Sequence, residues 1–128
     1  MVLLLDTHVL LWALNTPKRL SKAIIDQIEA PETEVYFSAA SIWEIAIKSS
    51  FGKINFRFSP EEIAQGARET GFIELPVSCA HAAKVASLFP HHRDPFDRLL
   101  IAQALLMPAQ LITADSALVP YSDLVRLV

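Results

Sequence analysis

The chain has one cysteine, three glycines and no long apolar run, and each of these scarcities excludes a class of protein. Cys79 alone cannot form an internal disulfide or supply a cysteine-based zinc site. No apolar stretch approaches the roughly 20 residues that span a bilayer. The apolar start of the chain, residues 1–5, has no basic segment and ends at Asp6, so we expect no signal peptide and a cytoplasmic location.

The chain also lacks an excess of basic residues. Fourteen acidic side chains face eleven Lys and Arg, for a net charge of −3, so the charge by itself does not point to a polyanion partner. If four of the acids bind cations, ten remain against the eleven basic side chains, and nucleic acid stays a permitted partner. Because the chain has 128 residues, 52% of them hydrophobic, we expect residues 1–128 to form a single domain with a sizeable core.

Apolar segments of strand length alternate with segments of helical pattern along the chain. Residues 2–5 form a continuous apolar run, which is typical of a central strand buried on both faces of a parallel sheet. Further strands are predicted at residues 34–38, 72–75, 110–113 and 124–127, and helices at residues 7–14, 22–30, 40–48 with an end near Gly52, 60–71, 78–88 and 97–107. This alternation predicts a three-layer α/β/α domain whose central sheet has four or five mainly parallel strands.

The segment 91–102 joins a polar loop to a strongly apolar helix and carries two acidic residues three positions apart. Asp94 precedes Pro95, an order typical of a helix N-cap followed by the first helical residue. Asp97 then falls in the first turn, near the electropositive end of the helix. We therefore expect Asp94 to be the cap, with metal binding as its alternative role, and the deeply packed helix to present Asp97 rigidly.

Four acidic residues are predicted to meet at one edge of the sheet: Asp6, Glu44, Asp97 and Asp115. Asp6 and Asp115 follow strands whose carboxyl ends share that edge, and Glu44 and Asp97 lie in the first turns of helices that can begin there. Carboxylates gathered in this way repel one another unless cations are bound, and their oxygens suit Mg²⁺ or Mn²⁺. Two such ions about 4 Å apart can activate water for attack on a phosphodiester.

Each acid also has a structural explanation when it is taken alone. Glu44 stands three residues after Ser41 and can close a capping box. Asp6 can cap the helix that follows it, Asp115 can hold an Asx-turn, and Asp97 can simply oppose the helix dipole. It is the set of four that favours a metal site over these separate explanations.

Several polar residues flank the acids and are candidates for supporting them or for binding substrate. Thr7, Thr113 and Ser116 can bond to the carboxylates or to bound water, although turn and cap roles explain them equally well. Lys48 stands four residues after Glu44, an order that favours a helical ion pair, and it can instead reach a substrate phosphate. The nearest basic side chains are candidates for phosphate contact, with surface solvation as the alternative: His91, His92, Arg93 and Arg98.

Four segments carry these acids in a characteristic order. They are residues 3–12 with Asp6, residues 41–48 with Glu44, residues 94–104 with Asp97 and residues 111–115 with Asp115. In sequence and spacing they resemble the PIN domain family, and its VapC-like toxin branch in particular. The resemblance spans nearly the whole chain, and residues 56–88 contribute little to it.

The resemblance implies a metal-dependent endoribonuclease that cleaves RNA phosphodiester bonds with metal-activated water. It implies that Mg²⁺ or Mn²⁺ is held by carboxylates at the positions of Asp6, Glu44, Asp97 and Asp115. It further implies the toxin half of a type II toxin–antitoxin pair, neutralised by a small antitoxin protein, and a homodimer. Many relatives have Asn where this chain has His8, and many have Asn at the position of Asp115, so the role of His8 and the number of metal ions stay open.

Two other functions remain as alternatives. The domain can be a catalytically weak PIN-like module that acts by binding a protein partner. It can also be a small metal-dependent phosphatase, although no second Asp stands two residues after Asp6, where His8 lies instead. A receiver-like domain is disfavoured because no Lys follows the strand at residues 110–113, and a dinucleotide site because no glycine-rich turn follows the first strand.

Overall fold

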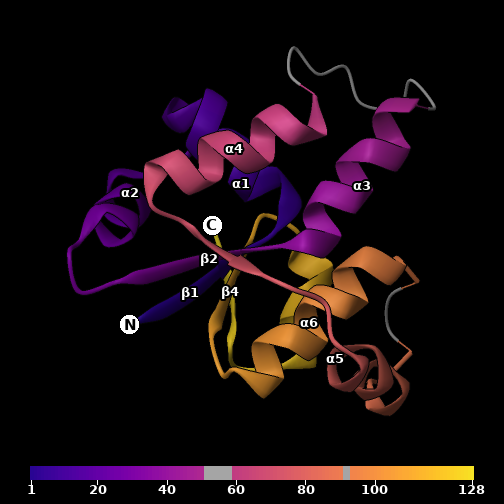
Figure 1. The fold of residues 1–128 in the computed structure, drawn as a ribbon. Helices are drawn as coiled ribbons and strands as arrows, with labels where there is room; N and C mark the ends of the chain where they lie inside the picture. Colours follow the sequence, from indigo (N-terminus) through magenta and orange to yellow (C-terminus); the bar gives the residue numbers. More distant parts are fainter. Residues whose placement is uncertain (51–58, 91–92) are drawn as a thin grey trace.

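A parallel sheet of five strands forms the middle of the computed structural model, which describes residues 1–50, 59–90 and 93–128 (Figure 1). The strands are β1 (Val2–Leu5), β2 (Glu34–Ser38), β3 (Ile73–Leu75), β4 (Gln110–Thr113) and β5 (Val125–Leu127). Every neighbouring pair in the order β3-β2-β1-β4-β5 is parallel. The predicted α/β class and mainly parallel sheet are confirmed.

The strand order places β1 at the centre of the sheet, between β2 and β4. The chain moves from β1 outward through β2 and β3, and then crosses to the other side of β1 for β4 and β5. Ligands of open parallel sheets bind at such a reversal of direction, beyond the carboxyl ends of the strands. The topology therefore marks the ends of β1 and β4 as the expected binding edge.

The central strand is buried on both of its faces. Leu3 and Leu5 pack into one hydrophobic cluster with residues of α1 (Thr7–Asn15) and α4 (Pro60–Thr70), whereas Leu4 packs into a second cluster with Leu100 and Ile101 of α6 (Pro95–Leu106). Side chains alternate between the two faces along a strand, so one run of leucines serves both clusters. This is the physical reason for the continuous apolar pattern of residues 2–5.

Helices cover both faces of the sheet. They are α1 (Thr7–Asn15), α2 (Lys22–Glu29), α3 (Ala39–Ser50), α4 (Pro60–Thr70), α5 (Cys79–Lys84) and α6 (Pro95–Leu106), with short 3-10 turns η1 (Pro17–Arg19), η2 (Val85–Ser87) and η3 (Ser116–Tyr121). Figure 1 shows α1, α2 and α4 on one side of the strands and α5 and α6 on the other. These are the three layers that the sequence predicts.

The helix boundaries follow local capping chemistry. Ser59 and Glu62 form a capping box at the start of α4, and Gly71 ends that helix with a φ of 97°, in the left-handed region that favours glycine. The helix predicted at residues 78–88 is wrong in length, because α5 ends at Lys84 and the 3-10 turn η2 follows. The predicted end of the third helix near Gly52 lies outside the described residues.

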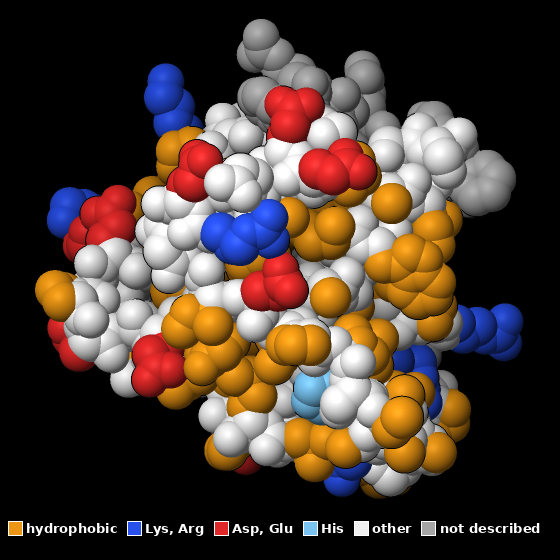
Figure 2. All heavy atoms as spheres, in the orientation of Figure 1, with side chains coloured by type: hydrophobic (Ala, Val, Ile, Leu, Met, Phe, Trp, Pro, Cys, Tyr) orange, Lys and Arg blue, Asp and Glu red, His pale blue; other side chains and the backbone are white. Residues whose placement is uncertain are grey.

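The surface differs between the two halves of the face seen in Figure 1. Hydrophobic side chains gather over the half that carries α5 and α6, and acidic side chains gather over α4 (Figure 2). Ile73, Val77 and Phe89 are among the exposed large apolar residues. Within the described ranges, none of the helices combines the length and the apolar character needed to cross a membrane.

Candidate active site

Asp6 lies at the carboxyl end of the central strand and caps the helix that follows. Its Oδ1 accepts the backbone N–H of Val9 at 2.9 Å, which makes it the N-cap of α1. Its Oδ2 accepts the hydroxyl of Thr113, at the end of β4, at 2.5 Å. Asp6 is only 5% exposed. The cap role that the sequence allows for Asp6 is confirmed, and its carboxylate is held by the first turn of α1 and by the end of β4.

Glu44 reaches the same edge from inside α3 rather than from its start. The helix begins at Ala39, so Ser41 is a helical residue and the predicted capping box of Ser41 and Glu44 is wrong. Ser38, which directly precedes the helix, instead accepts the backbone N–H of Ala40 at 3.0 Å. The second turn of α3 therefore directs the buried Glu44 side chain toward α1.

A hydroxyl pair holds Glu44 in place. Thr7 Oγ1 lies 2.6 Å from Glu44 Oε1 and 3.0 Å from Ser41 Oγ. Thr7 has one hydroxyl proton, and the carboxylate is the stronger acceptor, so the contact between Thr7 and Ser41 is made by the Ser41 proton. Sequence reasoning missed Ser41 as a supporting residue, and the signal was available: it stands one helical turn before Glu44.

The two carboxylates at the start of α6 have different tasks. Asp94 Oδ1 accepts the backbone N–H groups of Phe96 at 2.9 Å and of Asp97 at 3.1 Å, and Pro95 is the first helical residue. The predicted N-cap role of Asp94 is confirmed. Asp97 lies in the first turn, and Leu100 and Ile101 anchor the helix beneath it in the core.

Asp115 follows β4 and starts the turn η3. Its side chain accepts the backbone N–H of Ala117 at 2.9 Å, and its own N–H donates to Thr113 Oγ1 at 3.0 Å. The predicted turn role of Asp115 is thus present, and Thr113 connects this turn to Asp6. Ser116 is exposed and does not line the pocket described next.

The four acids come together in one pocket of about 200 Å³ at the reversal point of the sheet. The pocket is lined by Asp6, Thr7, His8, Glu44, Lys48, Asp94, Asp97 and Asp115. Among residues 1–50, 59–90 and 93–128, no three His, Cys, Asp or Glu side chains are arranged to hold a metal ion as they stand. Several of the pocket carboxylates are turned to partners within the chain, as the bonds of Asp6, Glu44 and Asp94 show.

Burial and charge perturb two groups in the pocket. Burial raises the pKa of Asp6 and outweighs the hydrogen bonds from Thr113 and Val9, which lower it. Burial lowers the pKa of Lys48, but the hydrogen bond and charge of Glu44, helped by Asp94 and Asp97, outweigh it, and the pKa is raised. The pocket thus carries concentrated negative charge, which Lys48 partly neutralises.

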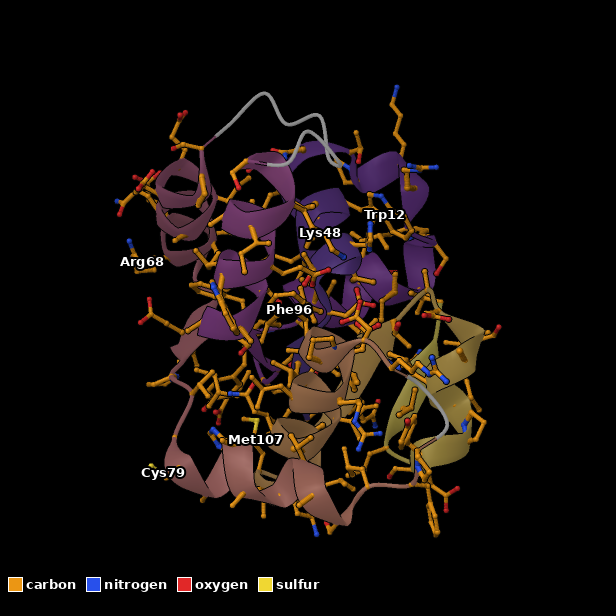
Figure 3. The ribbon with its side chains drawn as sticks, turned by 90° about the vertical axis from the view of Figure 1, so that its right-hand side faces the viewer. Trp12, Lys48, Arg68, Cys79, Phe96 and Met107 are labelled. Carbon is orange, nitrogen blue, oxygen red and sulfur yellow. The ribbon has the colours of Figure 1, made fainter. Side chains whose placement is uncertain are left out.

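Lys48 lines this pocket together with His8, and among the described residues it is the lysine or arginine that does so. Its ammonium pairs with Glu44 Oε2 and lies 4.0 Å from Asp94 Oδ2. Figure 3 shows Lys48 of α3 between Trp12 of α1 and Phe96 of α6. The helical ion pair predicted for Lys48 and Glu44 is confirmed.

Arg98 lies elsewhere and does not line the pocket. Its guanidinium donates to the backbone oxygens of Phe89 at 2.9 Å and Val85 at 3.2 Å, and to the hydroxyl of Tyr121 at 3.1 Å. These bonds tie the segment before α6 and the turn η3 to the helix. Arg93 is exposed, and His91 and His92 lie outside the described residues.

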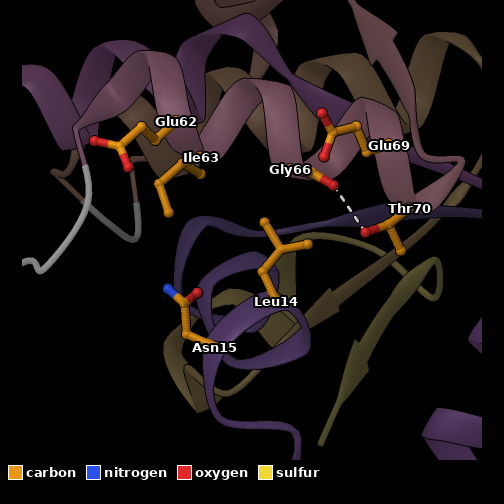
Figure 4. A pocket seen from close by; sticks show the side chains of 7 residues that line it. All are labelled: Leu14, Asn15, Glu62, Ile63, Gly66, Glu69 and Thr70. Carbon is orange, nitrogen blue, oxygen red and sulfur yellow. Dashed lines mark hydrogen bonds between the residues drawn. The ribbon is translucent and has the colours of Figure 1, made fainter.

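A second pocket, of about 320 Å³, lies between α1 and α4 (Figure 4). Glu62 and Glu69 stand on its α4 side above Leu14 and Asn15 of α1. Both carboxylates are exposed, and they accept bonds from Ser59 and Gln65 on their own helix or its cap. This pocket lacks the buried carboxylates found at the strand ends, so the acidic pocket is the better candidate for chemistry.

Comparisons with known proteins agree with this geometry. The PIN domain family model matches residues 3–122. Ribonuclease VapC22 of Mycobacterium tuberculosis (strain ATCC 25618 / H37Rv) is 33% identical over 119 residues, which cover 90% of this chain and 88% of the relative. This chain also aligns with a chain in the crystal structure of VapBC2 from Rickettsia felis bound to a promoter DNA fragment. The alignment covers all of this chain and 98% of the other, with a TM-score of 0.69 and 15% sequence identity. At that identity the similarity shows the fold alone.

Proposed function

Because the chain belongs to the PIN domain family, we propose that it is a metal-dependent endoribonuclease, the toxin of a type II toxin–antitoxin pair. One observation carries the proposal: Asp6, Glu44, Asp97 and Asp115, from four separate segments, line one pocket at the carboxyl ends of β1 and β4. The 33% identity to a protein named a ribonuclease supports RNA as the substrate.

The donor set of the pocket fits a hard divalent cation. The acidic side chains of the pocket supply carboxylate oxygens as ligand atoms, which hard cations prefer. Because Asp6 and Glu44 are buried, their negative charges destabilise the folded state unless a cation offsets them. We assign Asp6, Glu44, Asp97 and Asp115 as the residues that hold Mg²⁺ or Mn²⁺, directly or through water. When bound, the cation supplies Lewis-acid polarisation of the phosphodiester and makes water a nucleophile at neutral pH.

The chain's own residues orient the reaction. Thr113 fixes Asp6 and Thr7 fixes Glu44, so two carboxylates are preorganised by hydroxyl groups behind them. Lys48 stands at the same pocket with a positive charge that suits a phosphate oxygen. In the hydrolysis, the water oxygen bonds to phosphorus and the bond between phosphorus and the 3′ oxygen breaks. The 3′ oxygen takes up a proton released by the water, which leaves a 5′-phosphate and a 3′-hydroxyl.

The proposal includes partners and location. We propose RNA as substrate, a small antitoxin protein as the cognate inhibitor, a homodimer, and a cytoplasmic protein in which residues 1–128 act as one domain. Trp43 supports a macromolecular interface near the site, because it is 58% exposed while it packs edge-on against Phe96 at a centroid distance of 5.0 Å. Exposed tryptophan is uncommon away from interfaces.

The test is RNA cleavage by Asp97→Asn protein with Mn²⁺, compared with wild type and with Glu61→Gln. Glu61 is a matched control because it is also an acidic residue in the first turn of a helix that starts with proline, and it lies outside the pocket. We expect Asp97→Asn to lose cleavage while its circular dichroism stays native, and Glu61→Gln to retain cleavage. Cleavage at the wild-type rate by Asp97→Asn contradicts the proposal, and activity on a generic phosphomonoester with none on RNA favours the phosphatase.

A further inference from the structure

The ion pair of Lys48 and Glu44 differs from another ion pair of the same spacing, that of Lys22 and Asp26. Lys22 and Asp26 also stand four residues apart, at 2.9 Å, but their side chains are 89% and 57% exposed. The side chains of Lys48 and Glu44 are 28% and 4% exposed. Screening by water makes the first pair weak, whereas the second joins a half-buried ammonium to a buried carboxylate.

Both carboxylate oxygens of Glu44 have partners within the chain. Oε1 accepts the hydroxyl of Thr7, and Oε2 is paired with the ammonium of Lys48. A divalent cation that uses Oε2 must therefore take the place of that ammonium. The two positive charges also repel each other across a small, partly buried pocket, where the repulsion is stronger than in bulk water.

The ammonium lies within reach of more than one pocket carboxylate. It is 4.0 Å from Asp94 Oδ2, and the charge of Asp97 also acts on it. An ammonium in that position offsets the negative charge that Asp6, Glu44 and Asp97 bring together. Without such a counter-ion, the buried carboxylates of Asp6 and Glu44 and the half-buried carboxylate of Asp97 repel one another and destabilise the fold.

We propose that Lys48 is a built-in counter-ion of the acidic pocket, which a divalent cation must displace from Glu44, so that Lys48 sets the metal affinity of the protein. The inference rests on the metal site of the proposed function and adds a competition to it. Because coupling between two binding events is reciprocal, whatever stabilises the Lys48–Glu44 pair weakens metal binding, and metal binding releases the ammonium to solvent or to a substrate phosphate.

The first test is calorimetric titration of Mn²⁺ into wild-type, Lys48→Met and Lys22→Met proteins. Lys22→Met is the matched control, because it removes a helical ion pair of the same spacing away from the pocket. We expect Lys48→Met to bind Mn²⁺ about fivefold or more tightly than wild type and to melt at a lower temperature in EDTA. Lys22→Met should change neither property, and Lys48→Gln repeats the experiment with a polar side chain if the Met variant aggregates.

An equal or weaker Mn²⁺ affinity of the Lys48 variants overturns the inference. A second test uses the wild-type chain: the acetylation rate of Lys48 by an amine-reactive reagent, followed by mass spectrometry, should rise when Mn²⁺ is added, and that of Lys22 should not. An unchanged Lys48 rate at saturating Mn²⁺ also overturns it. If wild-type and Asp97→Asn proteins give the same Mn²⁺ isotherm, the proposed metal site itself has failed, and the competition fails with it.

Discussion

Thr113 donates its hydroxyl proton to Oδ2 of Asp6 over 2.5 Å, and this bond joins the carboxyl ends of the neighbouring strands β1 and β4. The same Thr113 oxygen accepts the backbone N–H of Asp115 at 3.0 Å. One buried hydroxyl therefore positions a carboxylate and the start of the turn that carries another. Its removal should affect both stability and cleavage.

Replacing Thr113 by valine keeps the shape of the side chain and removes the hydroxyl. The buried Asp6 carboxylate and the Asp115 N–H each lose a partner, so we expect the free energy of unfolding to fall by about 2 kcal/mol. Cleavage at saturating Mn²⁺ should fall by about tenfold, because Asp6 is less well oriented. Urea unfolding in EDTA and RNA cleavage rates measure the two effects. Thr113→Ser should restore most of both, and a Ser variant as impaired as the Val variant speaks against the role of the hydroxyl.

Asp6→Asn should stabilise the protein in EDTA at neutral pH, by about 1 kcal/mol. Burial raises the pKa of Asp6 in the folded state above its ordinary value of 3.8, which applies to the unfolded state. At a pH between the unfolded-state pKa and the folded-state pKa, the folded protein holds a proton that the unfolded protein has lost. The contribution of Asp6 to stability therefore declines as the pH rises through that window. Urea unfolding from about pH 8 down to about pH 4 should show the advantage of Asp6→Asn shrinking toward low pH. A constant or growing difference contradicts this reasoning.

Two substitutions of Asp94 distinguish a role as helix cap from a role as metal ligand. Asn caps a helix about as well as Asp, so Asp94→Asn should keep the stability of wild type and most of its Mn²⁺ affinity. Asp94→Ala loses the bonds to Phe96 and Asp97 and should lose about 1 kcal/mol in urea unfolding. If Asp94→Asn weakens Mn²⁺ binding as strongly as Asp97→Asn does, Asp94 is a ligand rather than only a cap.

Arg98 should matter for stability more than for RNA binding. Its guanidinium bonds to the backbone of Val85 and Phe89 and to the hydroxyl of Tyr121, so Arg98→Met should lower the free energy of unfolding by about 2 kcal/mol. The KM for RNA should stay close to wild type. Arg93→Met, which removes an exposed charge from the same segment, is the control for charge alone. A KM effect of Arg98→Met at unchanged stability would return Arg98 to the phosphate-binding candidates.

Most of the fold could be predicted because local chemistry and tertiary packing agree along this chain. The apolar run 2–5 indicates a buried strand and the Asp94–Pro95 pair indicates a helix start, and the structure contains both. The helix at residues 78–88 was overestimated because its pattern continues past Lys84, where the chain turns into η2. The strand order was not predicted, because neighbouring strands are chosen by long-range packing.

The candidate site could be assembled from the sequence only in part. The four acids were predicted to meet because parallel strands share a carboxyl edge, and the pocket contains all four. The partners of the carboxylates were less accessible. The spacing of Ser41 and Glu44 allows a capping box, but Ser41 lies inside α3. Arg98 is a candidate for phosphate contact by its place in the sequence, but its long side chain turns toward Val85 and Phe89. Rotamers of long or hydroxyl side chains depend on neighbours that are remote in sequence.

The most direct test of the central claim is mapping of cleavage sites in total cellular RNA treated with wild-type or Asp6→Ala protein in the presence of Mn²⁺. Wild type should produce a defined set of new ends that carry 5′-phosphates and disappear when EDTA is added. Asp6→Ala should produce none of them, while its circular dichroism remains native. The same set of ends, formed at the same rate by Asp6→Ala, would contradict the assignment of the acidic pocket as a metal-dependent ribonuclease site.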